Sequence, residues 1–251
     1  MNPKRIISLV PSQTELLFDL GLEEEIVGVT KFCIHPANKV ENKALVGGTK
    51  TLDINRIHAL KPDLILANKE ENTRGQIDDL QRHYPVHITD IATLPDALAM
   101  IREVGNLVGR VQESDKLAQQ IESLLLPCLS SFTLSVAYLI WRKTYMVAAS
   151  GTFIHAMLDV AGFRNAFADQ LRYPEVTPDD LQKVQPDLIF LSSEPYPFTK
   201  KHINELQEIC PSSQVLLVDG EMFSWYGSRL LRASAYFMNL RNEINHDRRS
   251  N

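Results

Sequence analysis

Short apolar runs alternate with amphipathic stretches along the first third of this chain. Strand-like runs fall at residues 6–10, 26–30, 63–67 and 86–90, and helix-like stretches at 12–21, 53–60 and 73–83. We expect Ser12 to cap the first helix in a capping box with Glu15, Gly21 to end it, and Gly47-Gly48 to form a turn. Alternating strands and helices predict an α/β lobe with a parallel sheet over residues 1–92.

The pattern becomes purely helical at residue 93. Apolar residues recur at steps of three or four, and Gly105 and Gly109 are expected to divide the stretch. We predict a helical linker over residues 93–130, whose second piece, 112–126, would span about 22 Å as a rigid strut. Strand and helix patterns then return, with strands at 134–140, 187–191 and 215–218 and helices at 153–161, 178–184, 200–209 and 228–244. They predict a second α/β lobe over residues 131–251.

One segment of the first half is repeated in the second. Residues 57–70 align with residues 181–194 without a gap, so that Pro62-Asp63-Leu64-Ile65 matches Pro186-Asp187-Leu188-Ile189 and Glu70 matches Glu194. The alternative is coincidence, because Pro commonly ends a helix and directs the chain into a strand. A true duplication predicts two similar lobes with a ligand site in the cleft at the carboxyl ends of their strands.

Composition narrows the function classes. The 251 residues are 44% hydrophobic and 23% charged, which is typical of a globular protein. The net charge of -5, with both signs interspersed, argues against a nucleic-acid partner. No apolar run reaches the roughly 20 residues that span a bilayer, so we expect a soluble chain. Met1 to Arg5 lead directly into residues 6–10 without an export signal, which leaves a cytoplasmic protein or a removed signal open.

Neither an enzyme nor a metal site is indicated by the motifs. Phosphate-binding, dinucleotide-binding, nucleophile-elbow and zinc-protease signatures are missing. The three cysteines, Cys33, Cys128 and Cys210, are widely spaced and odd in number, and we expect them to be buried without disulfides. The seven histidines lack metal-ligand spacing, although His35 and His155 lie beside candidate loops. The sequence therefore predicts a binding protein with no catalytic residue and no cofactor.

Polar and aromatic residues gather in the loops that follow the predicted strands, where α/β proteins place function. Aromatic rings beside Arg and Ser suit a large, partly apolar ligand with anionic or amide groups. Arg229 begins a helix, where the macrodipole disfavours a cation, so we expect an anionic partner, either Glu194 or the ligand. Loop packing for the aromatics and solvation for the glutamates are the alternatives. The candidate ligand-binding residues are Ser12, Lys31, Phe32, Asn68, Glu70, Trp141, Arg142, Phe153, Glu194, Tyr196, Phe198, Trp225, Tyr226 and Arg229.

The chain resembles a known family over almost its whole length. The resemblance rests on Ile6-Ser8-Leu9-Pro11-Ser12-Thr14-Glu15-Leu16, on Gly21 and Val27-Gly28-Val29, on the two Pro-Asp-Leu-Ile segments, on the central helix and on the aromatic loop before the last helix. The family is that of the periplasmic-binding-protein-like receptors with a helical backbone, also called class III, which serve ABC importers of cobalamin, haem and iron-siderophores. The chain is most similar to the cobalamin-binding branch.

The resemblance implies two Rossmann-like α/β lobes joined by a long rigid helix, a small-molecule ligand of the cobalamin, siderophore or haem class, an ABC permease as partner, a monomer, and a place in the periplasm or cell envelope. Cobalamin-binding relatives carry one outward glutamate on each lobe for permease docking, and those positions align with Arg74 and Ser224. Glu71 and Glu194 are the substitutes we expect for transporter docking. An aromatic expected in the first lobe aligns with Asn68.

Three other functions compete with capture for an importer. A cytoplasmic carrier or sensor of the same fold would need no permease, which agrees with the missing export signal. A bare metal-ion receptor would need about three or four clustered His, Asp or Glu side chains. A nitrogenase-like enzyme or metallochaperone would need cysteine ligands, and the three cysteines lie far apart.

Overall fold

A computed structural model describes residues 2–125 and 134–250, the last four of them as backbone only. The chain forms two compact units. Unit 1 comprises Met1–Ile91, Pro95–Ile121 and Tyr226–Arg229, and unit 2 comprises Ala92–Leu94, Glu122–Trp225 and Leu230–Asn251. The chain therefore crosses between the units near residue 92 and again within a helix at Ile121–Glu122. It crosses twice more, before and after Tyr226–Arg229, the four residues that the C-terminal half contributes to unit 1. Cys128 and the predicted end of the linker at residue 130 lie outside the described residues.

Unit 1 is built on a five-stranded sheet in the order β3-β2-β1-β6-β7, with every neighbouring pair parallel. The strands are β1 (Ile6–Ser8), β2 (Ile26–Val29), β3 (Ala44–Leu45), β6 (Leu64–Asn68) and β7 (Val86–Thr89), with a small hairpin of β4 (Gly47–Gly48) and β5 (Thr51–Leu52). Because all five strands are parallel, their carboxyl ends lie along one edge. This edge collects the loops that begin at residues 9, 30, 46, 69 and 90.

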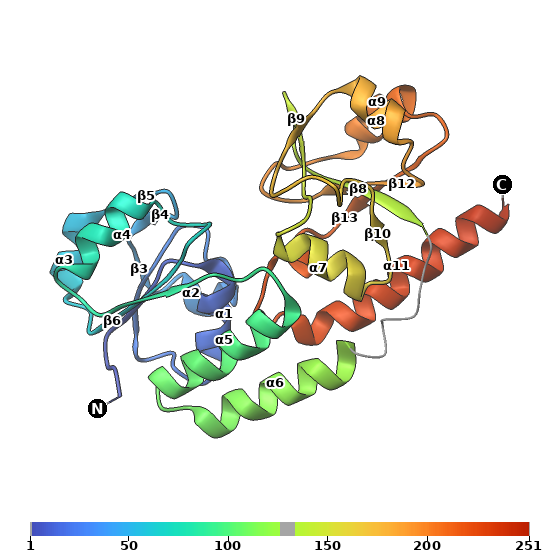
Figure 1. Ribbon diagram of the computed structural model, residues 1–251. Helices are drawn as coiled ribbons and strands as arrows, with labels where there is room; N and C mark the ends of the chain where they lie inside the picture. The colour runs from blue at the N-terminus through green and yellow to red at the C-terminus, as the bar shows by residue number, and fades with distance from the viewer. Residues whose placement is uncertain (1, 126–133, 251) are drawn as a thin grey trace. The chain divides into compact units, whose positions relative to one another are not determined.

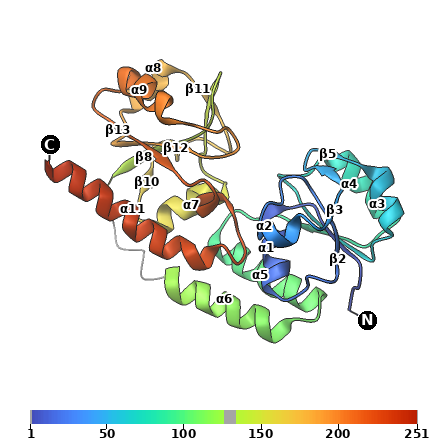
Figure 2. The ribbon, with the colours of Figure 1, turned by 180° about the vertical axis from the view of Figure 1, so that it is seen from behind.

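Helices cover both faces of the unit 1 sheet. Helices α3 (Ile54–Leu60) and α4 (Arg74–Gln81) lie on one face, and α1 (Pro11–Asp19) and α5 (Leu94–Leu107) lie on the other (Figures 1 and 2). The short α2 (Ala37–Val40) follows β2, and α6 (Val111–Leu125) follows α5. Ile7, Ile65 and Ile77 are among the fully apolar residues that fill the layer between the sheet and α3–α4. Burying both faces explains why the strand sequences are continuously apolar.

Unit 2 has a mixed sheet in the order β11-β9-β8-β12-β13, and β10 also pairs with β8. Its strands are β8 (Ser135–Trp141), β9 (Tyr145–Val147), β10 (Arg164–Asn165), β11 (Glu175–Val176), β12 (Leu188–Ser192) and β13 (Gln214–Val218). The central strands β8, β12 and β13 are parallel, whereas β9 and β11 are antiparallel to their neighbours. The three parallel strands again align their carboxyl ends.

Unit 2 is also layered. Helices α8 (Pro178–Val184) and α9 (Lys200–Ile209) cover one face of the sheet, and α7 (Phe153–Val160) and the long α11 (Leu230–Ser250) cover the other (Figures 1 and 2). The four-residue α10 (Glu221–Ser224) contacts α7 and α11. Leu181, Ile189 and Leu206 pack in the layer under α8 and α9. The predicted fold class, two α/β lobes with central parallel strands, is confirmed.

The repeated Pro-Asp segments adopt the same local structure in both units. Each preceding helix ends in a left-handed residue with φ 47° and ψ 61°, Lys61 after α3 and Gln185 after α8. The following aspartate then accepts hydrogen bonds from the start of the neighbouring strand. Asp63 accepts from the backbone N–H groups of Lys4 and Arg5 at 2.8 Å, and Asp187 accepts from the N–H and hydroxyl of Ser135 at 2.8 and 2.7 Å. The aspartate thus fixes the register of β6 on β1 and of β12 on β8.

Several expected details differ from the structure. No side chain caps α1, and Glu15 lies in an ion pair, so the expected capping box is wrong. Gly105 does not divide the helical stretch, because it lies inside α5 where a Cβ would meet Ser114 Oγ at 1.9 Å, and the break comes instead at Gly109, with φ 72°. Gly47-Gly48 forms β4 rather than the turn. Cys33 and Cys210 are buried and free, as expected.

The elements that sequence patterns missed are very short. They are α2, β3, β4, β5, β9, β10, β11 and α10, none of which exceeds four residues. Periodicity cannot identify elements of this length. In the described part of the chain, no helix combines the length and the apolar character that a bilayer-spanning segment requires.

Candidate ligand-binding site

An exposed apolar surface lies at the carboxyl edge of the unit 1 sheet, directly after β2. Phe32 is 49% exposed and Ile34 is 50% exposed, while Cys33 between them is buried. The Cys33 Sγ accepts a hydrogen bond from Thr14 Oγ1 at 3.0 Å, and its N–H donates to the Thr30 carbonyl, so the loop is anchored from inside. Lys31 Nζ lies 5.1 Å from the centre of the Phe32 ring. The loop therefore presents an aromatic ring with a cation beside it.

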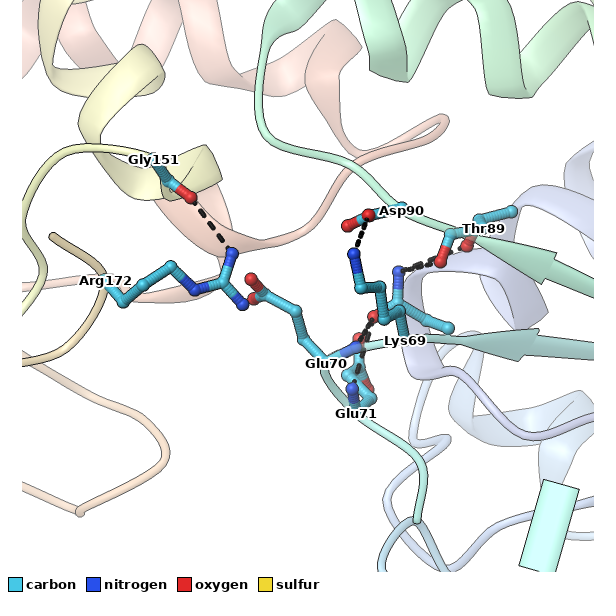
Figure 3. A network of polar contacts seen from close by, with 8 residues as sticks. Lys69, Glu70, Glu71, Thr89, Asp90, Gly151 and Arg172 are labelled. Carbon is cyan, nitrogen blue, oxygen red and sulfur yellow. Dashed lines mark hydrogen bonds and ion pairs between the residues drawn. The ribbon is translucent and has the colours of Figure 1, made fainter. Parts of the chain in front are cut away.

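The loop after β6 is organised by Asn68. Its side-chain Nδ2 donates to the Thr89 carbonyl at 3.1 Å, and its Oδ1 accepts from the N–H groups of Glu70 and Glu71 at 2.8 and 3.2 Å. Lys69 turns toward the Asp90 carboxylate on the neighbouring loop (Figure 3). Asn68 is buried, so the structure places this candidate as the support of its own loop, with both glutamates half-buried above it.

Four residues from the C-terminal half complete unit 1. Arg229 donates from Nε and Nη2 to the two carboxylate oxygens of Glu15 at 2.9 and 2.8 Å, and the two side chains are only 4% and 8% exposed. Tyr226 donates from its hydroxyl to Glu71 at 3.2 Å, and its burial raises the pKa of this phenol well above the ordinary value. An anionic partner for Arg229 is confirmed, but it is Glu15; the expected partner Glu194 is wrong, because its carboxylate bonds to Ser224 and Trp225 instead. Ser12 is buried in the first turn of α1, under Gly227.

A second aromatic and cationic surface lies in unit 2 at the end of β8. Trp141 is 42% exposed and packs edge-on against Tyr196, with ring centres 5.7 Å apart. Arg142 donates through Nε and Nη2 to both carboxylate oxygens of Glu205 at 3.1 and 2.6 Å. Tyr145 donates to the same carboxylate. The hydrogen bond from Arg142 lowers the pKa of Glu205 below its ordinary value, so the pair is ionised and Arg142 is held in place.

Glu194, in the loop after β12, is directed inward. Its Oε1 accepts hydrogen bonds from Ser224 Oγ at 2.6 Å and from the indole Nε1 of Trp225 at 2.9 Å. Burial is the largest cause that raises the pKa of Glu194 above its ordinary value, and the charge of Glu221 adds to it. Trp225 itself is buried. This carboxylate therefore organises the aromatic loop between β13 and α11.

The remaining aromatic candidates in unit 2 are packing residues. Phe153 is buried at the start of α7, and Phe198 is buried against Tyr196 with ring centres 4.8 Å apart. Of all the candidates, the structure exposes Lys31, Phe32 and Trp141, leaves Glu70, Glu71, Arg142, Glu194 and Tyr196 partly accessible, and buries Ser12, Asn68, Phe153, Phe198, Trp225, Tyr226 and Arg229.

Two exposed apolar residues were not predicted from the sequence. Ile34 follows Phe32 by two residues, and the alternation of exposed and buried side chains around Cys33 could have indicated that it is exposed. Leu171 is 75% exposed in unit 2, in a loop whose neighbour Arg172 has φ 66°. The Arg172 guanidinium donates to the Gly151 carbonyl at 3.2 Å (Figure 3). No strand or motif marks that loop in the sequence. Among the described residues, no group of three or more His, Cys, Asp or Glu could hold a metal ion.

The room for the Glu194 side chain depends on Gly220. A Cβ at this position would lie 2.4 Å from Ser192 Oγ and 2.7 Å from Glu194 Cγ. We expect Gly220→Ala to lower the free energy of unfolding by about 1–3 kcal/mol, because overpacking displaces both side chains. Gly75→Ala is the matched control, since nothing lies within 4 Å of its Cβ and Ala favours helix α4. Urea unfolding measures the free energy of unfolding of both variants. Equal values would contradict the tight packing around Gly220.

Comparison with known proteins identifies the relatives of this fold. The family model described as Periplasmic binding protein matches residues 6–211. The vitamin B12-binding protein of Pectobacterium carotovorum subsp. carotovorum (strain PC1) is 25% identical over 242 residues, which cover 92% of this chain and 86% of that protein. An uncharacterized ABC transporter substrate-binding lipoprotein of Bacillus subtilis (strain 168) is 28% identical over 201 residues, 75% of this chain and 63% of that protein.

Solved structures agree with this relationship at the level of the fold. The apo form of a periplasmic heme-binding protein from Roseiflexus sp. RS-1 superposes with a TM-score of 0.80 at 22% identity, covering 94% of this chain and 98% of that chain. At this identity the likeness concerns the path of the backbone, and each protein's own loops decide what it binds.

Proposed function

Because the chain belongs to the periplasmic binding protein family, we propose that it captures a metal complex of the cobalamin, haem or iron-siderophore class for an ABC-type importer. The family consists of solute receptors, not of enzymes. Similarity to a vitamin B12-binding protein supports the ligand class, and similarity to an ABC transporter substrate-binding lipoprotein supports the importer and a place in the cell envelope.

The observation that carries the proposal is a repeated pairing of an exposed aromatic ring with a cation. Unit 1 presents Phe32 with the Lys31 ammonium 5.1 Å from its ring, and unit 2 presents Trp141 with Arg142 as the next residue of the chain. Each pair lies at the carboxyl end of a parallel strand, β2 in one unit and β8 in the other. Exposed rings on anchored loops suit the flat apolar face of a macrocycle or chelate, and neighbouring cations suit its polar margin.

The two cations differ in how they would contact a ligand. Arg142 is already paired with Glu205, so it offers a fixed N–H group at the margin of the surface. Lys31 is exposed and rests over the Phe32 ring, so it can extend toward an anionic or amide group. Ile34 enlarges the apolar face in unit 1, where Asn68 is turned inward.

A ligand panel tests the proposal. Cyanocobalamin, haemin and a ferric hydroxamate siderophore are titrated while tryptophan fluorescence and the melting temperature are recorded, because a ligand bound by the native state raises its stability. We expect one class to quench fluorescence at micromolar concentration. Phe32→Ala and Trp141→Ala should each weaken its binding about tenfold, equivalent to about 1.4 kcal/mol per ring.

Met238→Ala is the matched control, because Met238 is an exposed apolar side chain on α11. It should bind like the native protein. If none of the three ligands quenches fluorescence or raises the melting temperature, the proposed ligand class is wrong. If a ligand binds and neither Phe32→Ala nor Trp141→Ala weakens it, the proposed surface is wrong.

Permease docking through Glu71 and Glu194 stays part of the proposal. Each carboxylate accepts internal hydrogen bonds, from Tyr226 in the first case and from Ser224 and Trp225 in the second. Charge reversal would break these bonds, so a loss of transporter stimulation could come from a destabilised fold as well as from failed docking. Glu→Gln changes are therefore the better test. The double variant E71Q/E194Q should bind ligand but stimulate the ATPase of its transporter less than the native protein does.

A second candidate function is a carrier or sensor that works without a permease. The observation in its favour is that Arg74 is exposed and carries the wrong charge for the docking glutamate of cobalamin-binding relatives, while Ser224 is bonded to Glu194. The genes beside this one distinguish the two functions, since permease and ATPase genes there support the importer.

A further inference from the structure

We propose that Glu194 is the positioning residue of the aromatic segment Ser224–Trp225, and that a proton on its carboxylate loosens this segment. The inference concerns the regulation of the unit 2 edge, so its importance for binding rests on the proposed function. Its structural basis lies entirely within unit 2 and can be tested without a ligand.

The geometry makes Glu194 the centre of a prepared acceptor site. One carboxylate oxygen, Oε1, accepts from two consecutive residues, Ser224 through its hydroxyl and Trp225 through its indole N–H. The Glu194 backbone is fixed as well, because its carbonyl accepts from Ser192 Oγ at 2.6 Å. Gly220 leaves the space through which the side chain passes. Through these contacts, the Glu194 carboxylate positions the start of the loop between α10 and α11.

The surroundings of this carboxylate oppose its negative charge. Asp219 and Glu221, on either side of Gly220, face Glu194 and add to the effect of burial in raising its pKa. The buried phenol of Tyr138 donates to Ser192 Oγ, and the hydroxyl of the half-buried Tyr236 accepts from the Asp219 N–H. On α7, which contacts α10, the ionisable groups are His155 and Asp159, whose side chains lie 3.6 Å apart. The charged groups that raise the pKa of Glu194 are therefore acidic.

Protonation has two opposite consequences at this site. Hydrogen bonds to a carboxylate are about twice as strong as those to a neutral group, so a proton weakens the hold on Ser224 and Trp225. The same proton removes the cost of burying a charge. Because the folded pKa is raised above about 4.5, the folded state takes up the proton first as pH falls. Stability from this group is thus greatest at acid pH and declines as pH rises through the folded pKa.

The test uses a protein with a single tryptophan. Trp141→Phe leaves Trp225 as the sole indole, because the chain has two tryptophans. Emission maximum and acrylamide quenching are recorded without ligand between pH 8 and pH 4. We expect a transition centred above pH 4.5, with red-shifted emission and at least twofold greater quenching on the acid side. Adding Glu194→Gln, which accepts a hydrogen bond but cannot ionise, should abolish the transition.

His155→Gln in the same background is the matched control, and it should keep the transition because His155 is paired with Asp159. Far-UV circular dichroism checks that each variant is folded across the range. The proposal is overturned if the folded single-tryptophan protein shows no transition, or if the transition persists with Gln at position 194. A gain in stability of Glu194→Gln at pH 8 but not at pH 4 provides a second, independent measure.

A ligand arm separates this inference from the proposed function. If cyanocobalamin, haemin or the ferric siderophore binds, its affinity should fall at acid pH in the native protein and vary less with pH in Glu194→Gln. If none binds, the fluorescence transition still decides the role of Glu194. If a ligand binds with the same pH dependence in both proteins, Glu194 does not act on the binding surface.

Discussion

Replacing Arg229 with leucine is expected to lower the free energy of unfolding by about 3–5 kcal/mol, because the change leaves Glu15 as a buried charge without its partner. Both side chains are almost fully buried, and the guanidinium engages both carboxylate oxygens. Water cannot replace those two hydrogen bonds without opening the packing around α1. Urea unfolding at pH 7, followed by circular dichroism, measures the loss.

The double variant Glu15→Leu with Arg229→Leu tests the cause of that loss. Replacing a buried pair with apolar side chains is often neutral or even stabilising, so the double variant should recover most of the stability. Arg74→Ala removes one partner of an exposed pair with Asp78 and should change stability by less than about 0.5 kcal/mol. A double variant as unstable as Arg229→Leu would mean that packing, and not the unpaired charge, dominates.

The second large effect is expected at Phe223. This ring is fully buried on α10 and packs against Tyr138, Phe190 and Phe237, with centres 5.2, 6.1 and 4.8 Å away. Phe223→Ala should lower the free energy of unfolding by about 3–5 kcal/mol, the usual range for a buried Phe that leaves a cavity. The measurement is urea unfolding of the whole chain, with tryptophan fluorescence reporting on unit 2.

Phe32→Ala is the control of the same chemistry at an exposed position. It should change stability by less than about 0.5 kcal/mol while weakening ligand binding. The two phenylalanines thus separate support of the fold from contact with the ligand. A stable Phe223→Ala variant would show that the aromatic cluster can collapse to fill the space.

The fold class could be predicted because its signals are local and repeated. Apolar runs of four or five residues define β2, β6, β12 and β13, and the shared Pro-Asp segment marks the entry into β6 and β12. Each of those aspartates satisfies backbone donors at the start of a neighbouring strand, so the segment recurs for a physical reason. The family resemblance then added the expectation that a long rigid helix joins the two lobes.

The partners of the candidate residues could not be predicted, because they lie far away in sequence. Arg229 pairs with Glu15 across 214 positions, and Arg142 pairs with Glu205 across 63. Composition and periodicity describe one stretch of chain at a time, whereas these pairs depend on which stretches meet. The expected capping role of Glu15 failed for this reason: a local motif was outweighed by a distant cation.

The burial of the aromatic loop residues was the other property that could not be predicted from the sequence. Trp225 and Tyr226 share the aromatic character of Phe32 and Trp141, yet they are buried and their polar atoms bond to glutamates. An aromatic loop residue can be a ligand contact or a packing residue, and only its exposure tells which. The candidate site therefore consists of the two exposed rings, Phe32 and Trp141, with the neighbouring cations Lys31 and Arg142, and its role stays a prediction.

The four residues Tyr226–Arg229 also determine how this protein could be dissected. An N-terminal fragment that stops before them would keep Glu15 and Glu71 but lose the side chains that bond to both. We expect such a fragment to fold less stably on its own, although it contains all five strands of the unit 1 sheet. The first half of the chain therefore depends on the second half for the partners of two of its carboxylates.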